Sequence, residues 1–261
     1  MFDLHIHTRL SHDSQSEPQK MARRAAFLGL KEICFTDHYD RYGSTHDNLV
    51  DPTKYNEIFT EPFCEGVTVR HGIEFGLAPD NTELLSQIQK DFLPFDYVIG
   101  SLHRVNLDFG AYSPEFWVNK TAREGFDTYL RELLKRVKVH ENYDCLGHMT
   151  FALKSPYNPD RRPVYYNDCR DVADEIMKEL VSRGKGMEIN ISGMKMVGEF
   201  LPSKDYLVRF KELGGEIVTE GSDAHNTERV GAHCNEAVAV AKEVFGYVCT
   251  YSGRKPQFHK L

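Results

Sequence analysis

The chain has 261 residues, of which 41% are hydrophobic and 27% charged; its formal net charge is −7, and it has twelve histidines against one tryptophan. This apolar content excludes a disordered or fibrous protein, and 32 basic against 39 acidic residues argue against an electrostatic nucleic-acid binder. No apolar run reaches the roughly 18 residues of a spanning helix, the N-terminus lacks a signal-peptide layout and the six cysteines are scattered, so we expect one cytoplasmic domain over residues 1–261.

Seven short apolar, β-branched or aromatic runs predict strands. In chain order they are Phe2 to His7, Ile33 to His38, Thr68 to Phe75, Tyr97 to His103, Cys145 to Thr150, Met187 to Ser192 and Glu216 to Glu220. Stretches of helical period lie among them, at Pro18 to Leu28, Thr121 to Glu141, Asp168 to Arg183, Ser203 to Leu213 and Arg229 to Phe245. Residues 40–62 and 104–120 carry turn residues and are predicted to be loops. Each step between strands is long enough for a helical crossover, which predicts an α/β fold with a parallel sheet closed into a barrel.

Metal-type side chains follow the apolar residues at the C-terminal ends of six runs. They are His5, His7, His38, Glu74, His103, His148, Asp223 and His225. Strand C-termini converge on one face of a parallel barrel, and residues two apart on a strand share a face. A single histidine at a strand end is more often a packing residue, but six strands with this pattern predict a metal site. Mixed imidazole and carboxylate ligands suit zinc, iron or manganese, whereas magnesium and calcium prefer oxygen.

Short motifs surround these residues along most of the chain. They are His5-x-His7 with Ser11-x-Asp13, Thr36-Asp37-His38, Gly72-Ile73-Glu74, Gly100-Ser101-Leu102-His103, Gly147-His148 and Gly221-Ser222-Asp223-Ala224-His225. With them the sequence resembles the polymerase and histidinol phosphatase (PHP) family of metal-dependent phosphoesterases. It is most similar to the stand-alone histidinol-phosphatases, through residues 97–103, 188–193 and 212–217 and the tail Arg254-Lys255-Pro256.

The resemblance implies a distorted (β/α)7 TIM-like barrel with up to three divalent transition metals at the C-terminal ends of its strands. The first metal would be held by His5, His7, Glu74 and Asp223, the second by Glu74, His103 and His148, and the third by Asp13, His38 and His225. The family places a ligand two residues after Ser11, which favours Asp13; His12 is the alternative ligand or a donor on the phosphate side.

The implied activity is hydrolysis of L-histidinol phosphate to L-histidinol and phosphate in histidine biosynthesis, by attack of a metal-bridging hydroxide. Asp223, Glu74 and His12 are the catalytic candidates. The substrate-binding candidates are Lys154, Arg162 and Lys195 for the phosphate, and Asp40 and Tyr42 for the cationic tail. Lys154 stands at the usual arginine position after Gly147-His148, and residues 190–195, which end in Lys195, replace the Asn-Thr-Ser-Gly and basic residue that relatives often show. An ammonium does not reproduce a bidentate guanidinium contact.

Two alternatives stay open at this point. One is a broader phosphoesterase or an exonuclease of the same family, although the charge of −7 and the absence of a basic, aromatic-interleaved stripe disfavour nucleic acid as a substrate. The other is a metal-stabilised module without activity, which is disfavoured because all nine ligand positions carry competent side chains. We therefore expect a small phosphate monoester as the partner, no membrane, and an oligomeric state that the sequence does not determine.

Overall fold

Parallel strands form the centre of the molecule, in a computed structural model that describes residues 1–43, 48–160 and 164–261. Their spatial order is β1 (Phe2–Ile6), β2 (Glu32–Phe35), β5 (Thr68–Gly76), β6 (Tyr97–Ser101), β7 (Cys145–Leu146), β8 (Gly186–Asn190) and β9 (Val218–Gly221). A short strand, β3 (His38–Asp40), pairs in parallel with β5 and antiparallel with β4 (Asn48–Leu49).

The barrel closes where the chain after β9 meets β1. Ile6 pairs with Ala224 in parallel, and the His7 N–H donates to the Ala224 carbonyl at 2.9 Å. Near the start of β1, the Asp3 carboxylate accepts hydrogen bonds from the backbone N–H and the hydroxyl of Ser222 at 2.8 and 2.6 Å. The seven-stranded, nearly closed parallel barrel confirms the predicted fold class.

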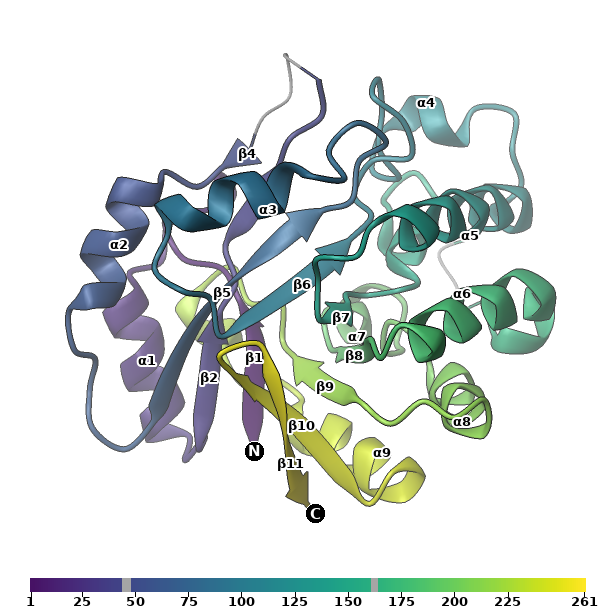
Figure 1. The fold of residues 1–261 in the computed structure, drawn as a ribbon. Coiled ribbons are helices and arrows are strands. Elements are labelled where there is room, and N and C mark those ends of the chain that lie inside the picture. The colour runs from purple at the N-terminus through teal and green to yellow at the C-terminus, as the bar shows by residue number, and fades with distance from the viewer. Residues whose placement is uncertain (44–47, 161–163) are drawn as a thin grey trace.

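Helices surround the strands (Figure 1). The predicted ones appear as α1 (Pro18–Phe27), α5 (Ala122–Val139), α6 (Arg170–Ser182), α8 (Lys204–Glu212) and α9 (Cys234–Val244). The structure adds α2 (Pro52–Thr60), α3 (Leu84–Ile88), α4 (Pro114–Trp117) and α7 (Gly193–Met196), with 3-10 turns at Gln89–Asp91, Phe151–Lys154, Tyr166–Asp168 and Thr227–Arg229. None of the described helices is long and apolar enough to cross a membrane.

Two predicted strands are shorter than expected because side chains take the place of ladder partners. The run from Ile33 to His38 breaks after Phe35, where the Asp37 carboxylate accepts from the Thr8 N–H at 2.6 Å and the Ser11 hydroxyl at 2.7 Å. The run after Cys145 keeps strand geometry for two residues, and the His148 N–H then donates to the Glu188 carboxylate.

The predicted loops at 40–62 and 104–120 are wrong in part, since each contains a helix. The Asp51 carboxylate caps α2 by accepting from the Thr53 N–H at 2.8 Å, and Pro52 occupies the first turn. Pro114 likewise occupies the first turn of α4, where Ser113 makes no capping hydrogen bond with its side chain. Asp-Pro and Ser-Pro pairs are therefore helix starts here, although they are also typical of turns.

A C-terminal hairpin was not predicted. Strands β10 (Tyr247–Ser252) and β11 (Lys255–Lys260) pair antiparallel across Gly253 and Arg254, whose φ values of 55° and 65° fit a two-residue turn. The Tyr251 ring stacks on Tyr97 with centroids 4.7 Å apart. Both rings belong to a small buried cluster inside the barrel, together with Leu4, Cys34, Ile99 and Cys145. The hairpin thus packs against the barrel interior near both chain ends (Figure 1).

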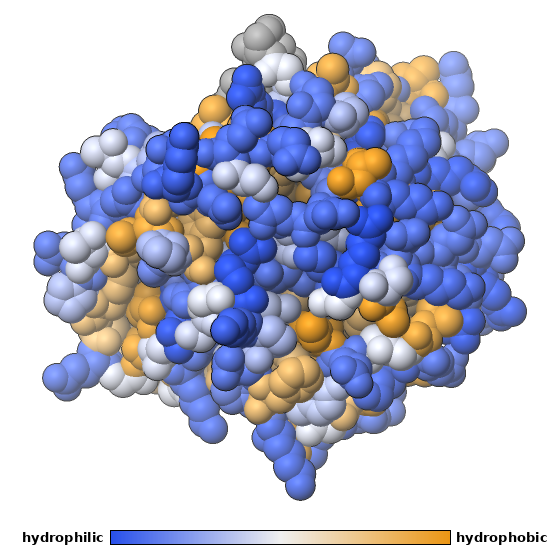
Figure 2. Space-filling view, in the orientation of Figure 1, coloured by the Kyte–Doolittle hydropathy of each residue, from blue (hydrophilic) through white to orange (hydrophobic). Residues whose placement is uncertain are grey.

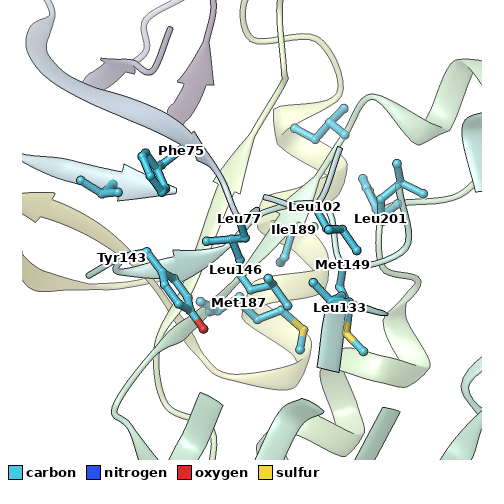
Figure 3. Packing of buried hydrophobic residues seen from close by; sticks show 14 of the residues in the cluster. Phe75, Leu77, Leu102, Leu133, Tyr143, Leu146, Met149, Met187, Ile189 and Leu201 are labelled. Carbon is cyan, nitrogen blue, oxygen red and sulfur yellow. The ribbon is translucent and has the colours of Figure 1, made fainter. Parts of the chain in front are cut away.

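The main core lies between the barrel and its helices. Leu146 and Met187, from β7 and β8, pack near Leu133 of α5 (Figure 3). Hydrophilic residues cover most of the face seen in Figure 2. Several of the buried polar side chains, among them His5, His7, Glu74 and His148, instead lie at the C-terminal ends of the strands.

Candidate metal centre at the barrel mouth

The strand ends bring the predicted ligand side chains to one end of the barrel. His5 lies on β1 with His7 just after it, His38 on β3 and Glu74 on β5; His103, His148, Asp223 and His225 follow β6, β7 and β9, and Asp13 lies in the loop after β1. All except Asp13, His103 and His225 are at least nine-tenths buried. The barrel topology accounts for this convergence, because parallel strands all end at the same face.

The first group surrounds one oxygen of Glu74. Glu74 Oε2 lies 3.3 Å from His5 Nε2 and 3.4 Å from His7 Nε2, and the two imidazole nitrogens are 3.0 Å apart. Asp223 Oδ1 lies 3.3 Å from His7 Nε2. Four atoms that could bind a metal, from β1, β5 and the chain after β9, therefore lie close together.

The second group uses the other oxygen of the same carboxylate. Glu74 Oε1 lies 2.8 Å from His148 Nε2 and 3.2 Å from His103 Nε2, and these nitrogens are 3.4 Å apart. Glu74 is fully buried between the two groups. Its position fits the bridging role that the sequence resemblance implied.

A third group lies nearer to solvent. Asp13 Oδ2 lies 3.1 Å from His225 Nε2 and 3.6 Å from His38 Nε2. His12 is half exposed, and its Nδ1 is 3.8 Å from the Asp13 carboxylate. The geometry thus favours Asp13 over His12 as the ligand and leaves His12 on the wall of the mouth.

Asp40 and Tyr42, the predicted contacts of the substrate tail, lie beside the histidines of the second and third groups. Asp40 Oδ1 lies 3.0 Å from His103 Nδ1, Asp40 Oδ2 lies 3.3 Å from His38 Nδ1, and the Tyr42 hydroxyl donates to Asp40 Oδ1 at 3.1 Å. Tyr42 is only 2% exposed. The Asp40 carboxylate contacts two candidate ligand histidines and lines the cavity above them, whereas the Tyr42 phenol lies behind it; contact of either side chain with the substrate stays a prediction. Gly76 provides the room, since a Cβ there would lie 2.1 Å from Asp40 Oδ1.

A cavity of about 330 Å³ opens above the three groups. Its wall includes Lys154, whose Nζ donates to Asp223 Oδ2 at 2.9 Å and to the Ser192 hydroxyl at 2.8 Å. Lys195 is exposed on α7 and lies outside the lining that the described residues form, because α7 turns it outward. Arg162 lies outside the described residues.

Sequence reasoning missed three further residues of the cavity wall, Asn48, Tyr112 and Phe151. The last two form an aromatic wall with ring centroids 4.9 Å apart. The sequence analysis also assigned no role to Glu188, whose Oε1 is 2.6 Å from His5 Nδ1. The available signal was an acid between the apolar residues Met187 and Ile189 of a strand, since a buried charge requires partners.

The site keeps its carboxylates charged. Burial alone would raise the pKa of Glu74, but the His103, His5 and His38 rings hold that pKa well below its ordinary value. Lys154 and His5 likewise keep the pKa of Asp223 well below its usual range against the effect of burial. Burial acts to lower the pKa of His103, but Asp40 and Glu74 raise it to about 9. Ionised carboxylates are the form that binds a cation.

The donor set fits divalent transition metals. Glu74 Oε2 is buried and has no hydrogen-bond partner among the described residues, although the Nε2 atoms of His5 and His7 lie 3.3 and 3.4 Å away. Zinc–nitrogen and zinc–oxygen bonds near 2.0–2.1 Å give a tetrahedral edge of about 3.3–3.4 Å, which matches these separations. A shared cation would satisfy all these atoms together.

Residues 3–192 match the sequence model of the PHP domain. The chain belongs to the PHP domain family. The matched segment ends before β9, so the PHP match covers seven of the nine clustered side chains, and the structure adds Asp223 and His225.

Relatives cover nearly the whole PHP chain. The histidinol-phosphatase of Lactococcus lactis is 32% identical over 261 residues, covering 97% of this chain and 95% of that protein. A probable histidinol-phosphatase of Clostridium acetobutylicum is 29% identical and covers 93% of both chains.

Solved structures show the same architecture. The crystal structure of the L. lactis histidinol phosphate phosphatase, with zinc, L-histidinol and phosphate, has a TM-score of 0.85 at 31% identity and covers 98% of both chains. The putative histidinol phosphatase of Listeria monocytogenes has a TM-score of 0.69 at 15% identity, and this likeness concerns the fold alone.

Proposed function

We propose that this protein hydrolyses L-histidinol phosphate to L-histidinol and phosphate with the help of bound divalent metals. The observation that carries the proposal is the convergence of nine ligand-type side chains into three neighbouring groups below a cavity with a lysine on its wall. The L. lactis relative, which contains zinc, L-histidinol and phosphate, supports the substrate.

The proposed ligand sets follow the three groups. His5, His7, Glu74 and Asp223 hold the first ion, Glu74, His103 and His148 the second, and Asp13, His38 and His225 the third. Zinc is the proposed metal, with iron and manganese compatible with the same donors. Such ions supply positive charge for the phosphate dianion and make hydroxide accessible near neutral pH.

The chain's own side chains then perform the remaining tasks. Lys154 directs its ammonium into the cavity beside Asp223 and binds a phosphate oxygen. Asp223 orients the attacking water through hydrogen bonding, and His12, on the half-exposed rim, donates a proton to the leaving alkoxide. Tyr112 and Phe151 offer flat apolar contact to the imidazole of the substrate.

Metal analysis combined with a screen of phosphate esters tests the proposal. We expect up to three ions per chain and a kcat/KM for L-histidinol phosphate far above those for serine phosphate and p-nitrophenyl phosphate. Both phosphate release and the second ion should be lost in His103→Ala. Equal turnover of all esters would contradict the substrate and favour a broad phosphoesterase. No release with zinc, iron or manganese would contradict the reaction class.

A further inference from the structure

Glu188 is a buried carboxylate on β8 that does not belong to the three ligand groups. It is 1% exposed. Its Oε1 lies 2.6 Å from His5 Nδ1, and its Oε2 accepts from the His148 N–H at 2.8 Å and from Asn190 Nδ2 at 3.1 Å. One side chain therefore touches a proposed ligand of the first ion and the backbone of a proposed ligand of the second.

The contact with His5 selects one form of the ring. An ionised carboxylate only accepts hydrogen bonds, so the hydrogen must be on His5 Nδ1. In the neutral ring that binds a metal, the other nitrogen, His5 Nε2, then carries the lone pair, and it faces Glu74 Oε2 and His7 Nε2 at 3.3 and 3.0 Å. A carboxylate on the far nitrogen of a ligand histidine is the usual way to set its tautomer and orientation.

The contact with His148 replaces sheet pairing. Strand β7 has only two residues, and the chain leaves the ladder before His148. Its backbone N–H is held instead by Glu188 Oε2. The space is tightly shared with β9, because a Cβ on Gly221 would lie 2.5 Å from Glu188 Oε1 and 2.3 Å from His5 Cβ.

The side-chain amide of Asn190 is a further hydrogen-bond donor to the Glu188 carboxylate. Ser192 donates its N–H and its hydroxyl to Asn190 Oδ1 at 3.0 and 2.6 Å, which turns the Asn190 NH2 toward Glu188. Three donors therefore meet the two carboxylate oxygens, from His5, His148 and Asn190. A glutamine at this position would direct its own NH2 at one of them.

We propose that Glu188 is a positioning residue that fixes His5 in the Nδ1–H form and aligns the His148 segment, so that both imidazoles present Nε2 to the metal ions. The inference rests on the proposed metal-dependent function. The inference adds a carboxylate that hydrogen-bonds to two of the proposed ligands. Replacing a residue that hydrogen-bonds to a metal ligand typically changes metal affinity about 10- to 100-fold.

Zinc affinity of Glu188→Gln, measured by competition with a chromogenic chelator, tests the proposal. The matched control is Glu220→Gln on the neighbouring strand β9. Glu220 is also fully buried and accepts a backbone hydrogen bond, from the Phe2 N–H, but contacts no proposed ligand. We expect zinc binding to weaken about 10- to 100-fold in Glu188→Gln and to stay within about threefold of wild type in Glu220→Gln. Circular dichroism of the metal-free proteins checks that both variants fold.

The protonation of His5 in the zinc-loaded wild type gives a second test that needs no variant. Long-range proton–nitrogen NMR spectra distinguish a protonated Nδ1 from a protonated Nε2. We expect a hydrogen on Nδ1 and zinc on Nε2.

Three results would overturn the inference: zinc bound through His5 Nδ1, wild-type affinity in Glu188→Gln, or equal losses in both glutamine variants. Neither readout uses a phosphate ester. A failed ester screen would therefore refute the proposed substrate and leave the inference standing, whereas a wild type that binds no zinc would refute both.

Discussion

Replacing Lys154 with methionine tests how the site holds an anionic substrate. Lys154 Nζ lies between Asp223 Oδ2 and the Ser192 hydroxyl and 5.0 Å from the centroid of the Phe151 ring. The side chain is 13% exposed, so water screens its charge only in part. Methionine has a similar length and keeps the contact with Phe151, but it cannot bind a phosphate oxygen.

The expected loss follows from one charged hydrogen bond. Such a bond contributes about 1.5–3 kcal/mol, which corresponds to a decrease in kcat/KM of about 10- to 150-fold. If Lys154 binds the phosphate equally in the ground state and the transition state, KM rises and kcat is unchanged. If the contact strengthens as charge moves to the transferred phosphoryl group, kcat falls.

Phosphate release from L-histidinol phosphate at saturating zinc measures the effect, with the metal content determined on the same samples. Lys135→Met is the control, because Lys135 is exposed on the outer helix α5 and pairs with Glu132. The reasoning is refuted if fully loaded Lys154→Met keeps kcat/KM within twofold of wild type, or if the control loses as much.

Three further predictions concern stability. Burial raises the pKa of Glu220 from 4.5 to about 8. At a pH between these two pKa values, Glu220 is ionised in the unfolded chain but protonated in the folded protein. The free energy of unfolding of wild type therefore falls by up to about 1.4 kcal/mol per pH unit as the pH rises. In urea unfolding of the metal-free proteins, the free energy of unfolding of Glu220→Gln should therefore rise relative to that of wild type from pH 5 to 8. A difference that stays constant over this range would contradict the prediction. Gly76→Ala should cost about 1–3 kcal/mol in the same assay and lower zinc affinity, because the methyl group displaces Asp40 from His103; unchanged affinity would argue against the role of Asp40. Chelation should abolish phosphate release and lower the melting temperature, since an ion at 1,000 times its Kd stabilises by about 4 kcal/mol; zinc should restore both.

The barrel was predictable because its strands are short apolar runs that end in polar residues. His38, Glu74 and His103 mark three strand ends in the sequence, and parallel strands bring their ends together without further information. The hairpin of β10 and β11 was missed although Gly253 and Arg254 separate its strands, because neither strand shows strict alternation. The break after Phe35 depends on hydrogen bonds between Asp37 and residues far away in the sequence, which no local pattern reveals.

The clustering of the candidate ligand side chains was predictable from the sequence, whereas the side chains behind them were harder to find. Spacing alone places His5 and His7 on one face, and the structure brings them together; their binding of metal stays a prediction. The contact of Asp40 with His103 was not predicted, because it depends on how β3 pairs with β5 and β5 with β6; contact of Asp40 with the substrate stays a prediction. Glu188 reaches His5 across β9, so its role also depends on tertiary packing. One domain over residues 1–261 likewise stays a prediction.

The closure between β1 and the end of β9 has a consequence for the order of folding. Asp3 and Ser222, which join these strands, are separated by 219 positions in sequence. We expect contacts of such separation to form late, because closing so long a loop costs conformational entropy that shorter-range contacts must first reduce. His5 and His7 are synthesised first, yet they meet Asp223 only when the last strand of the barrel has docked. We therefore expect zinc to enter a barrel that is already assembled, and the N-terminal histidines to have little influence on how early the chain begins to fold.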